Sequence, residues 1–85
     1  MTYTVVFRDG ISRETRGIPG PEMKKILVAI RRYAETGYGD VIALKGRPGE
    51  YRQRVGDWRI LFAIDYSSNE LVVQHIAHRR EAYRD

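Results

Sequence analysis

Residues 50–64 contain two β-rich segments separated by only two residues, and this spacing constrains the fold more than any other feature of the sequence. Glu50–Val55 and Trp58–Ile64 are rich in β-branched and aromatic residues, and Gly56-Asp57 between them is a good turn sequence. Two strands joined by a two-residue loop form an antiparallel hairpin with a fixed register. That register predicts the facing pairs Val55 with Trp58, Arg54 with Arg59, Gln53 with Ile60, Arg52 with Leu61 and Tyr51 with Phe62.

The predicted register separates the hairpin side chains by their chemistry. One face receives a largely apolar set, which is the kind of surface that a helix covers: Tyr51, Gln53, Val55, Trp58, Ile60, Phe62 and Ile64. The other face receives Arg52, Arg54 and Arg59. The hairpin therefore predicts both a core and a strongly basic surface.

The rest of the chain supplies material to complete one α+β domain. Residues 3–7 predict a first strand, 71–77 predict a last strand, and 45–49 predict a basic loop that leads into the hairpin. Apolar residues recur at helical spacing over 22–36, with Pro21 at the start and Gly37 at the end, whereas glycines and a proline limit any helix in 12–16 to about one turn. We expect a single domain over 1–85, in which an antiparallel sheet of three to four strands carries an N-terminal helix on one face.

Composition excludes several classes of protein. The 85 residues are 42% hydrophobic and 31% charged, and no apolar run approaches the ~20 residues that span a bilayer, so neither a disordered chain nor a transmembrane helix is expected. The absence of cysteine excludes disulfide frameworks and cysteine-based zinc sites. Because the N-terminal residues lack the pattern of a signal peptide, we expect a cytosolic protein with no membrane partner.

The net charge of +4 is modest, but the basic residues cluster. Arg54 opposite Arg59 places like charges face to face, which costs about 0.2–1 kcal/mol unless a carboxylate or an external anion lies nearby. Glu50 and Asp65 are the candidate carboxylates. The alternative is that these arginines are solvated surface residues, loosely paired with Glu50 and Asp57.

A further basic pair lies directly before this hairpin in the sequence. Lys45 and Arg47 precede it, and with them we weigh an anion-binding site and a solvated surface as equally supported readings. Basic residues on the predicted helix are most simply a solvated face, although they also offer a sequence-tolerant contact with RNA: Lys24, Lys25, Arg31 and Arg32.

The second basic group follows the last strand, in the run His78-Arg79-Arg80-Glu81-Ala82-Tyr83-Arg84. A histidine beside arginine can transfer protons near neutral pH, and a nearby tyrosine can orient a phosphate or stack on a base. His75 points opposite to His78 within the strand and is interpreted as structural. The sequence contains no catalytic-triad spacing, no paired-histidine metal pattern and no phosphate-binding glycine motif, so we expect no metal and no cofactor.

Cleavage of an RNA phosphodiester by arginine and histidine side chains is the chemistry that fits these residues without a metal. The ribose 2′-hydroxyl already lies beside the scissile phosphate, so an enzyme has only to remove its proton, stabilise the charge on phosphorus and protonate the leaving 5′-oxygen. Cations stabilise the charge, and a titrating group transfers the protons.

Two segments of the sequence are distinctive as a pair. The first is Leu44-Lys45-Gly46-Arg47-Pro48-Gly49-Glu50-Tyr51-Arg52-Gln53-Arg54-Val55-Gly56-Asp57-Trp58-Arg59-Ile60-Leu61-Phe62-Ala63-Ile64-Asp65, and the second is Ile76-Ala77-His78-Arg79-Arg80-Glu81-Ala82-Tyr83. Together they resemble the RelE/ParE superfamily of type II toxins, and its RelE-like members in particular. The resemblance covers about half of the chain. It implies a compact fold like that of microbial RNases, with helices packed on an antiparallel sheet. It also implies cleavage of mRNA in the ribosomal A site, which leaves a 2′,3′-cyclic phosphate and a 5′-hydroxyl.

Position by position, the resemblance implies a set of catalytic residues: Arg52, Arg54, Arg59, His78, Arg79 and Tyr83. Lys45, Arg47 and Arg80 are expected to bind RNA. Some members have lysine on the second strand, where this chain has arginine, which does not release its proton in practice. His78 is therefore the first candidate for the general base and Glu50 the second.

The resemblance also implies partners and leaves rival functions open. The expected partners are a cognate antitoxin, the ribosome and mRNA, and the expected state is a monomer or a toxin–antitoxin hetero-oligomer. The first helix is abbreviated compared with that of the family, which affects the surface for the antitoxin. ParE-like relatives inhibit DNA gyrase instead of cleaving RNA, and a catalytically inert binding protein on the same fold is the third reading.

Overall fold

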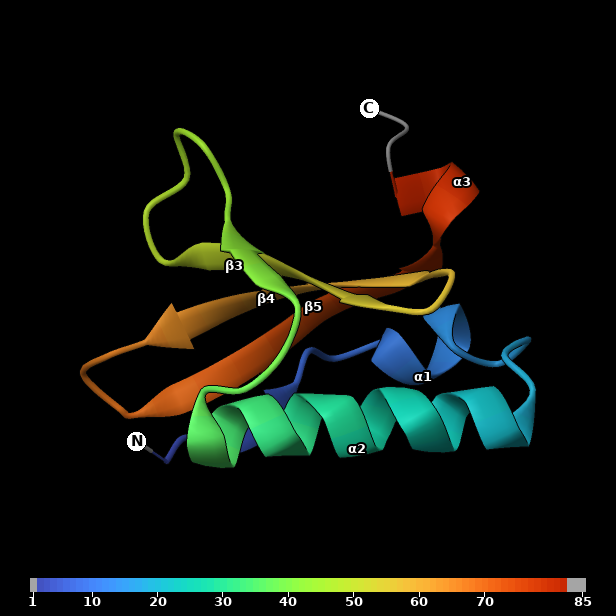
Figure 1. Ribbon diagram of the computed structural model, residues 1–85, viewed down its shortest axis with the longest axis horizontal. Helices are drawn as coiled ribbons and strands as arrows, with labels where there is room; N and C mark the ends of the chain where they lie inside the picture. The colour runs from blue at the N-terminus through green and yellow to red at the C-terminus, as the bar shows by residue number, and fades with distance from the viewer. Residues whose placement is uncertain (1, 83–85) are drawn as a thin grey trace.

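The computed structural model describes residues 2–82 and forms two layers, a five-stranded sheet and a long helix (Figure 1). The strand order is β1-β5-β4-β3-β2. Along the chain the elements are β1 (Thr4–Phe7), α1 (Ile11–Glu14), α2 (Gly20–Thr36), β2 (Val41–Ala43), β3 (Glu50–Val55), β4 (Trp58–Asp65), β5 (Glu70–His78) and α3 (Arg79–Ala82).

The β3–β4 hairpin confirms the predicted register. Val55 faces Trp58, Arg54 faces Arg59, and the pairing continues to Glu50 opposite Ala63. Gly56 takes a φ of 58°, a left-handed conformation that a side chain would strain, so glycine at the first loop position permits the two-residue turn.

The sheet differs from the prediction in strand number and direction. The prediction of three to four antiparallel strands was wrong in detail, because β2 adds a fifth strand at one edge and β1 pairs with β5 in parallel at the other. β2 has only three residues and therefore little sequence signal. The parallel pairing joins Thr4 to Glu70 and Phe7 to Val73, and no local pattern specifies a contact between such distant segments.

Helix α2 begins at Gly20, two residues before the predicted start, and ends before Gly37, whose N–H donates to the Tyr33 carbonyl. Its buried residues, Ile26, Ile30 and Ala34, recur at four-residue spacing and pack on the sheet. The sheet contributes the other core side chains: Tyr3, Ile60, Phe62, Ile64, Leu71, Val73 and Ile76. We call the sheet surface that faces α2 the inner face, and the opposite surface the outer face.

A β-bulge in β5 shifts the alternation of its side chains by one residue, so that Ile76 and not His75 is buried. Leu61 pairs with His75 but Phe62 pairs with Val73, so Gln74 is the extra residue. The polar groups at the bulge have partners, since Arg8 Nε donates to the Gln74 carbonyl at 2.7 Å and the Ile76 N–H donates to the Glu14 carboxylate at 3.2 Å. Glu14 thereby fixes the short helix α1 to the outer side of β5.

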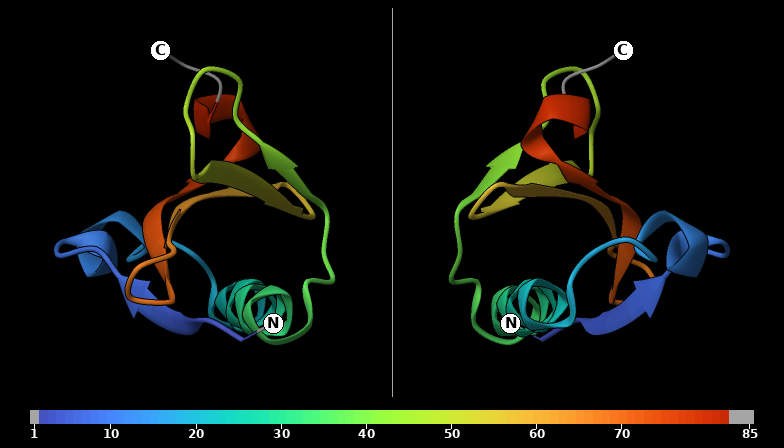
Figure 2. Two further views of the ribbon diagram at one scale, coloured as in Figure 1. Left: turned by 90° about the vertical axis from the view of Figure 1, so that its left-hand side faces the viewer. Right: turned by 90° about the vertical axis from the view of Figure 1, so that its right-hand side faces the viewer.

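The sheet curves around α2, so that α2 lies on its concave side (Figure 2). The β2–β3 loop and α3 both rise from the convex, outer side (Figures 1 and 2). Among residues 2–82, none of the helices has the length and the apolar character to cross a membrane.

Candidate functional site

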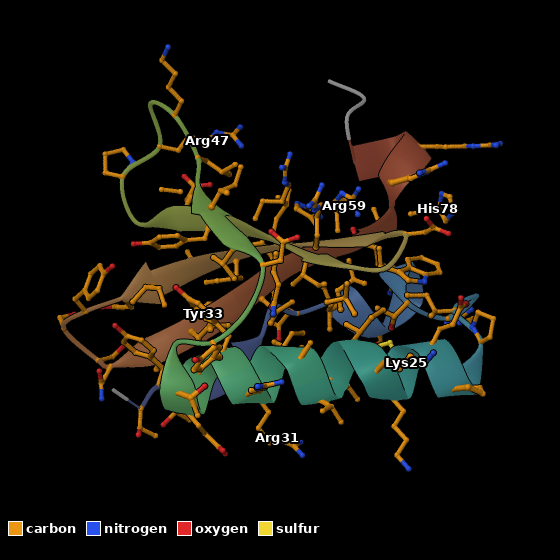
Figure 3. All side chains as sticks on the ribbon, viewed as in Figure 1. Lys25, Arg31, Tyr33, Arg47, Arg59 and His78 are labelled. Carbon is orange, nitrogen blue, oxygen red and sulfur yellow. The ribbon has the colours of Figure 1, made fainter. Side chains whose placement is uncertain are left out.

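The outer face carries a row of charged residues from β3 and β4. Strand alternation places Glu50, Arg52 and Arg54 on the same face, and cross-strand pairing adds Arg59 opposite Arg54. We call Arg52, Arg54 and Arg59 the arginine face. Figure 3 shows Arg59 on the side of the sheet away from α2, between the loop that carries Arg47 and the base of α3, where His78 lies.

Arg59 and Arg79 meet at the β3–β4 turn. Arg59 is only 7% exposed, and its Nη1 donates to the carbonyls of Gly56 at 3.1 Å and Trp58 at 3.0 Å. The Arg79 backbone N–H donates to the Asp57 carbonyl at 2.7 Å, and its Nη1 lies 3.8 Å from Asp57 Oδ1. Arg59 therefore braces the turn from within, whereas the exposed Arg79 guanidinium lies at its rim.

Arg54 has a carboxylate partner that the sequence did not indicate. Its Nε donates to Asp40 Oδ2 at 2.8 Å, and both side chains are about half exposed. Asp40 lies directly before β2 and is brought beside Arg54 by the pairing of β2 with β3, as the hydrogen bond from the Arg54 N–H to the Asp40 carbonyl also shows. The Asp40 carboxylate therefore offsets part of the repulsion between the facing charges of Arg54 and Arg59.

Asp65, one of the two carboxylates proposed for that role, does something else. Its Oδ1 accepts hydrogen bonds from the Ser67 hydroxyl at 2.6 Å and from the backbone N–H groups of Ser67 and Ser68. The Ser67 hydroxyl bond above all holds the pKa of Asp65 below its usual value. Asp65, which the sequence offered only as a candidate for that role, therefore shapes the β4–β5 turn.

The predicted RNA-binding residues frame the outer face from two sides. Lys45 and Arg47 are exposed in the β2–β3 loop, which backbone hydrogen bonds from Arg47 to Leu44 and from Glu50 to Arg47 fold into turns. Arg80 is exposed on α3. The basic residues of α2 belong to the other side of the molecule, as Figure 3 shows for Lys25 and Arg31.

His78 is not brought onto the arginine face by the strand pairing. It pairs with Trp58, and the two rings contact edge to face with centroids 5.4 Å apart, whereas Arg59 pairs with Ala77. Since cross-strand partners share a face, His78 lies with Trp58 at the end of β5. Of the two candidates for the general base, it is Glu50 that shares a face with Arg52. Tyr83 lies outside the described residues.

His75 has the structural role that the sequence predicted. Its Nδ1 lies 2.8 Å from Glu14 Oε1, and Glu14 Oε2 accepts from Arg8 Nη2 at 3.4 Å. These contacts join β5, α1 and the end of β1. Among the described residues, no group of three His, Cys, Asp or Glu side chains is arranged to hold a metal ion.

A cluster of tyrosines at the other end of the sheet was missed by the sequence analysis. The hydroxyls of Tyr51 and Tyr66 are 2.7 Å apart, and the Tyr3 and Tyr66 rings contact edge to face. The hydrogen bond to Tyr66 is the largest cause that raises the pKa of Tyr51 to about 12. Burial raises the pKa of Tyr33, whose ring packs against Phe62. The sequence contains no sign of this cluster, because Tyr3, Tyr51 and Tyr66 are far apart in the chain and meet only in the folded protein.

Comparison with solved structures identifies the fold as that of RelE toxins. The chain superposes on a double mutant of Escherichia coli toxin RelE in the free state with a TM-score of 0.78, 17% identity, and coverage of 98% of this chain and 88% of that one. A chain of the RelB-RelE antitoxin-toxin complex from Methanococcus jannaschii gives a TM-score of 0.77, 22% identity and coverage of 92% and 94%. A chain of the archaeal RelE-RelB complex from Pyrococcus horikoshii gives 0.77, 21% identity and coverage of 93% and 97%.

At these identities the similarity establishes the fold, and the resemblance noted in the sequence is confirmed at that level. No family model and no curated protein matches the chain.

Proposed function

We propose that this protein is the toxin of a type II toxin–antitoxin system and that it cleaves mRNA in the ribosomal A site without a metal. The observation that supports this most strongly is the set of basic residues that three segments contribute to the outer side of a RelE fold: the arginine face, Lys45 and Arg47 on the β2–β3 loop, and Arg79 and Arg80 on α3. Arginine suits the geometry and the charge of a phosphate.

In the proposed reaction the 2′-oxygen of the ribose forms a bond to phosphorus while the bond from phosphorus to the 5′-oxygen breaks. The products are a 2′,3′-cyclic phosphate and a 5′-hydroxyl. Arg52, Arg54 and Arg79 bind the phosphate and stabilise its charge, and Arg59 supports them from beneath by bracing the turn. Tyr83 is proposed to orient the substrate or to stack on a base.

For proton transfer we propose that Glu50 accepts the proton of the 2′-hydroxyl and that His78 donates a proton to the leaving 5′-oxygen. The choice of Glu50 rests on its position on the same face as Arg52, two residues away on β3. His78 lies at the end of β5, directly before Arg79, with its ring against Trp58. This order reverses the ranking that the sequence alone favoured.

The first test is to induce the wild type and the Arg54→Ala, Arg79→Ala double variant in a bacterial host and to map a translated reporter mRNA by primer extension. We expect in-frame cleavage during translation with the wild type and none with the double variant. Arg13→Ala is the matched control, because Arg13 is an exposed arginine on α1 outside the site, and it should cleave like the wild type.

The other outcomes separate the rival functions. Growth arrest with intact mRNA and accumulating DNA breaks would replace the proposal with gyrase inhibition. Soluble wild-type protein without any phenotype would replace it with a binding protein on a toxin fold. Within the nuclease reading, Glu50→Gln should slow cleavage by about 10²–10⁴-fold, the usual contribution of a general base. Unchanged cleavage by this variant would overturn the assignment of Glu50.

The remaining proposals concern the partners. A cognate antitoxin binds and neutralises the toxin, and the ribosome presents the mRNA, so the protein acts in the cytoplasm where translation takes place. Cations on the β2–β3 loop attract ribosomal RNA without reading its sequence, and raising the salt concentration should weaken this contact.

A further inference from the structure

Asp40 contacts Arg54 through both its backbone and its side chain. The Arg54 N–H donates to the Asp40 carbonyl at 2.9 Å, and Arg54 Nε donates to Asp40 Oδ2 at 2.8 Å. Asp40 comes directly before β2, and the register that pairs Val41 with Gln53 extends by one residue to place it opposite Arg54. Because cross-strand partners share a face, the carboxylate belongs to the same face of the sheet as the arginine.

The ion pair uses only the Nε–H of Arg54, although a guanidinium carries further donors on both Nη atoms. Within the described part of the chain, these Nη atoms have no hydrogen-bond partner, and the Asp40 carboxylate has none besides Arg54. The edge formed by Nη1 and Nη2 matches two oxygens of a phosphate. Asp40 therefore holds Arg54 at Nε and leaves the edge that suits a phosphate open.

The connection that carries Asp40 is fixed against the core. Gly37 ends α2 in a left-handed conformation with a φ of 78°. A Cβ on Gly39 would lie 3.0 Å from Nε2 of Gln53, which is 1% exposed and donates to the Ala29 carbonyl at 3.2 Å. The backbone before Asp40 thus passes closely over a buried side chain, and the carboxylate projects from a defined position.

Arg54 depends on such a partner because its other neighbour across the sheet is a cation. Arg59 faces it on β4, is 7% exposed, and binds carbonyl groups of the β3–β4 turn through Nη1. The two like charges repel each other, and Arg54, which is about half exposed, is the one that can turn away. Without Asp40 the Arg54 guanidinium would sample many orientations, since a long exposed side chain has many rotamers.

We propose that Asp40 is a positioning residue for the cleavage reaction, which orients Arg54 so that both of its Nη atoms face the scissile phosphate. The inference rests on the proposed function, because it takes Arg54 to bind that phosphate. Asp40 acts on the rate of the chemical step, since an oriented guanidinium stabilises the charge that develops on phosphorus. A carboxylate that only masked Arg54 would have the opposite effect, because its removal would free a cation for RNA.

The test is single-turnover cleavage of a defined mRNA on ribosomes, with the full chain in excess. Its dependence on concentration gives the rate constant at saturation and the half-saturating concentration separately. Asp40→Ala should lower the rate constant by about tenfold and change the half-saturating concentration by less than about threefold. Asp40→Asn keeps an oxygen that accepts from Arg54 Nε, and its rate constant should lie within about threefold of the wild type. Thermal unfolding of each variant checks that it is folded.

Asp9→Asn is the matched control, because it makes the same charge change at an exposed aspartate in the turn after β1, and it should cleave within about twofold of the wild type. A double-variant cycle tests whether Asp40 acts through Arg54. Arg54→Lys keeps the charge but has no planar group to orient. In that background, Asp40→Ala should therefore cause no further loss of rate.

Three results would overturn the inference while the nuclease assignment stands. If Asp40→Ala cleaves as fast as the wild type, Asp40 does not orient Arg54. If Asp40→Ala and Asp40→Asn both cleave faster than the wild type, the carboxylate masks the arginine instead. If Asp40→Ala slows cleavage equally in the wild-type and Arg54→Lys backgrounds, it acts through another group. Absence of cleavage by the soluble wild type would instead overturn the proposed function, and this inference with it.

Discussion

The two faces of the sheet are built from alternate residues of the same strands, yet different physical effects determine them. On the inner face, Ile60, Phe62 and Ile64 are almost fully buried, and hydrophobic burial fixes which residues belong there. On the outer face, the side chains are chosen for charge and hydrogen bonding, and one of them, Arg59, is as buried as the core. The comparison teaches that an outward position in a strand does not by itself mean a solvated side chain.

The largest expected effect on stability comes from truncating a buried side chain of the inner face. Phe62→Ala should lower the free energy of unfolding by about 3–5 kcal/mol, because it removes a fully buried ring that contacts Tyr33 and Tyr51. Leu61→Ala, one residue away on the outer face and half-buried, should cost about 1–2 kcal/mol. Urea unfolding of both variants measures the difference, and equal costs would show that the two faces are not distinct.

The next largest effect is a difference in stability between alanine variants of two arginines that face each other. Arg59→Ala should cost about 1–3 kcal/mol, because the Gly56 and Trp58 carbonyls lose a charged donor in a buried setting. Arg54→Ala should cost at most about 1 kcal/mol, because its ion pair with Asp40 is exposed. Denaturant midpoints test this prediction, and a loss for Arg54→Ala as large as that for Arg59→Ala would contradict it.

A smaller effect is expected where the outer face holds α1. Glu14→Ala removes the partner of Arg8, His75 and the Ile76 N–H, and should cost about 1–2 kcal/mol. Hydrogen exchange at the Ile76 amide should accelerate, because its acceptor is lost. Glu35→Ala, an exposed carboxylate near the end of α2, is the control and should leave that amide unchanged. Slow exchange in the Glu14 variant would mean that the bulge is held by something else.

The smallest effect concerns the tyrosine pair at the end of the sheet. Tyr66→Phe should lower the pKa of Tyr51 from about 12 toward its ordinary value of 10, because the Tyr66 hydroxyl is the main cause of the shift. Ultraviolet absorbance of tyrosinate follows the titration, with Tyr38→Phe as the control. If Tyr51 still titrates near 12 in the Tyr66 variant, burial and neighbouring charge cause the shift instead.

The sign of this pKa shift also predicts how stability depends on pH. A pKa raised in the folded state means that folding favours protonated Tyr51, so its contribution is complete below pH 10 and declines as the pH rises toward about 12. Tyr66→Phe should therefore reduce the alkaline loss of stability that the wild type shows in that interval.

Local features of the fold could be predicted from the sequence, and non-local features could not. The β3–β4 hairpin and α2 follow from short-range patterns, such as a two-residue turn and helical spacing of Ile26, Ile30 and Ala34. The parallel pairing of β1 with β5 joins residues more than sixty positions apart. The bulge at Gln74 could not be predicted either, because Arg8 and Glu14, which bind its backbone, lie about sixty residues earlier in the sequence.

The candidate site divides in the same way. Arg52, Arg54 and Arg59 follow from the hairpin register, and that grouping is confirmed as geometry. Asp40 was missed because its proximity to Arg54 depends on β2, a strand too short to predict. The position of His78 beside Trp58 depends on how β4 pairs with β5, which the hairpin register does not determine. Their catalytic roles stay predictions.

The strand order also has a consequence for the synthesis of this chain. Of the five strands in the described part of the chain, β1 leaves the ribosome first, but its neighbour in the sheet is β5, which leaves last. During translation β1 therefore waits without its partner until Glu70–Val73 have emerged, and contacts of such long range form late in folding. Arg79 follows β5 directly, so the sheet and the basic surface above it are completed together. A nascent chain thus has no assembled basic surface until residues 70–79 have been made.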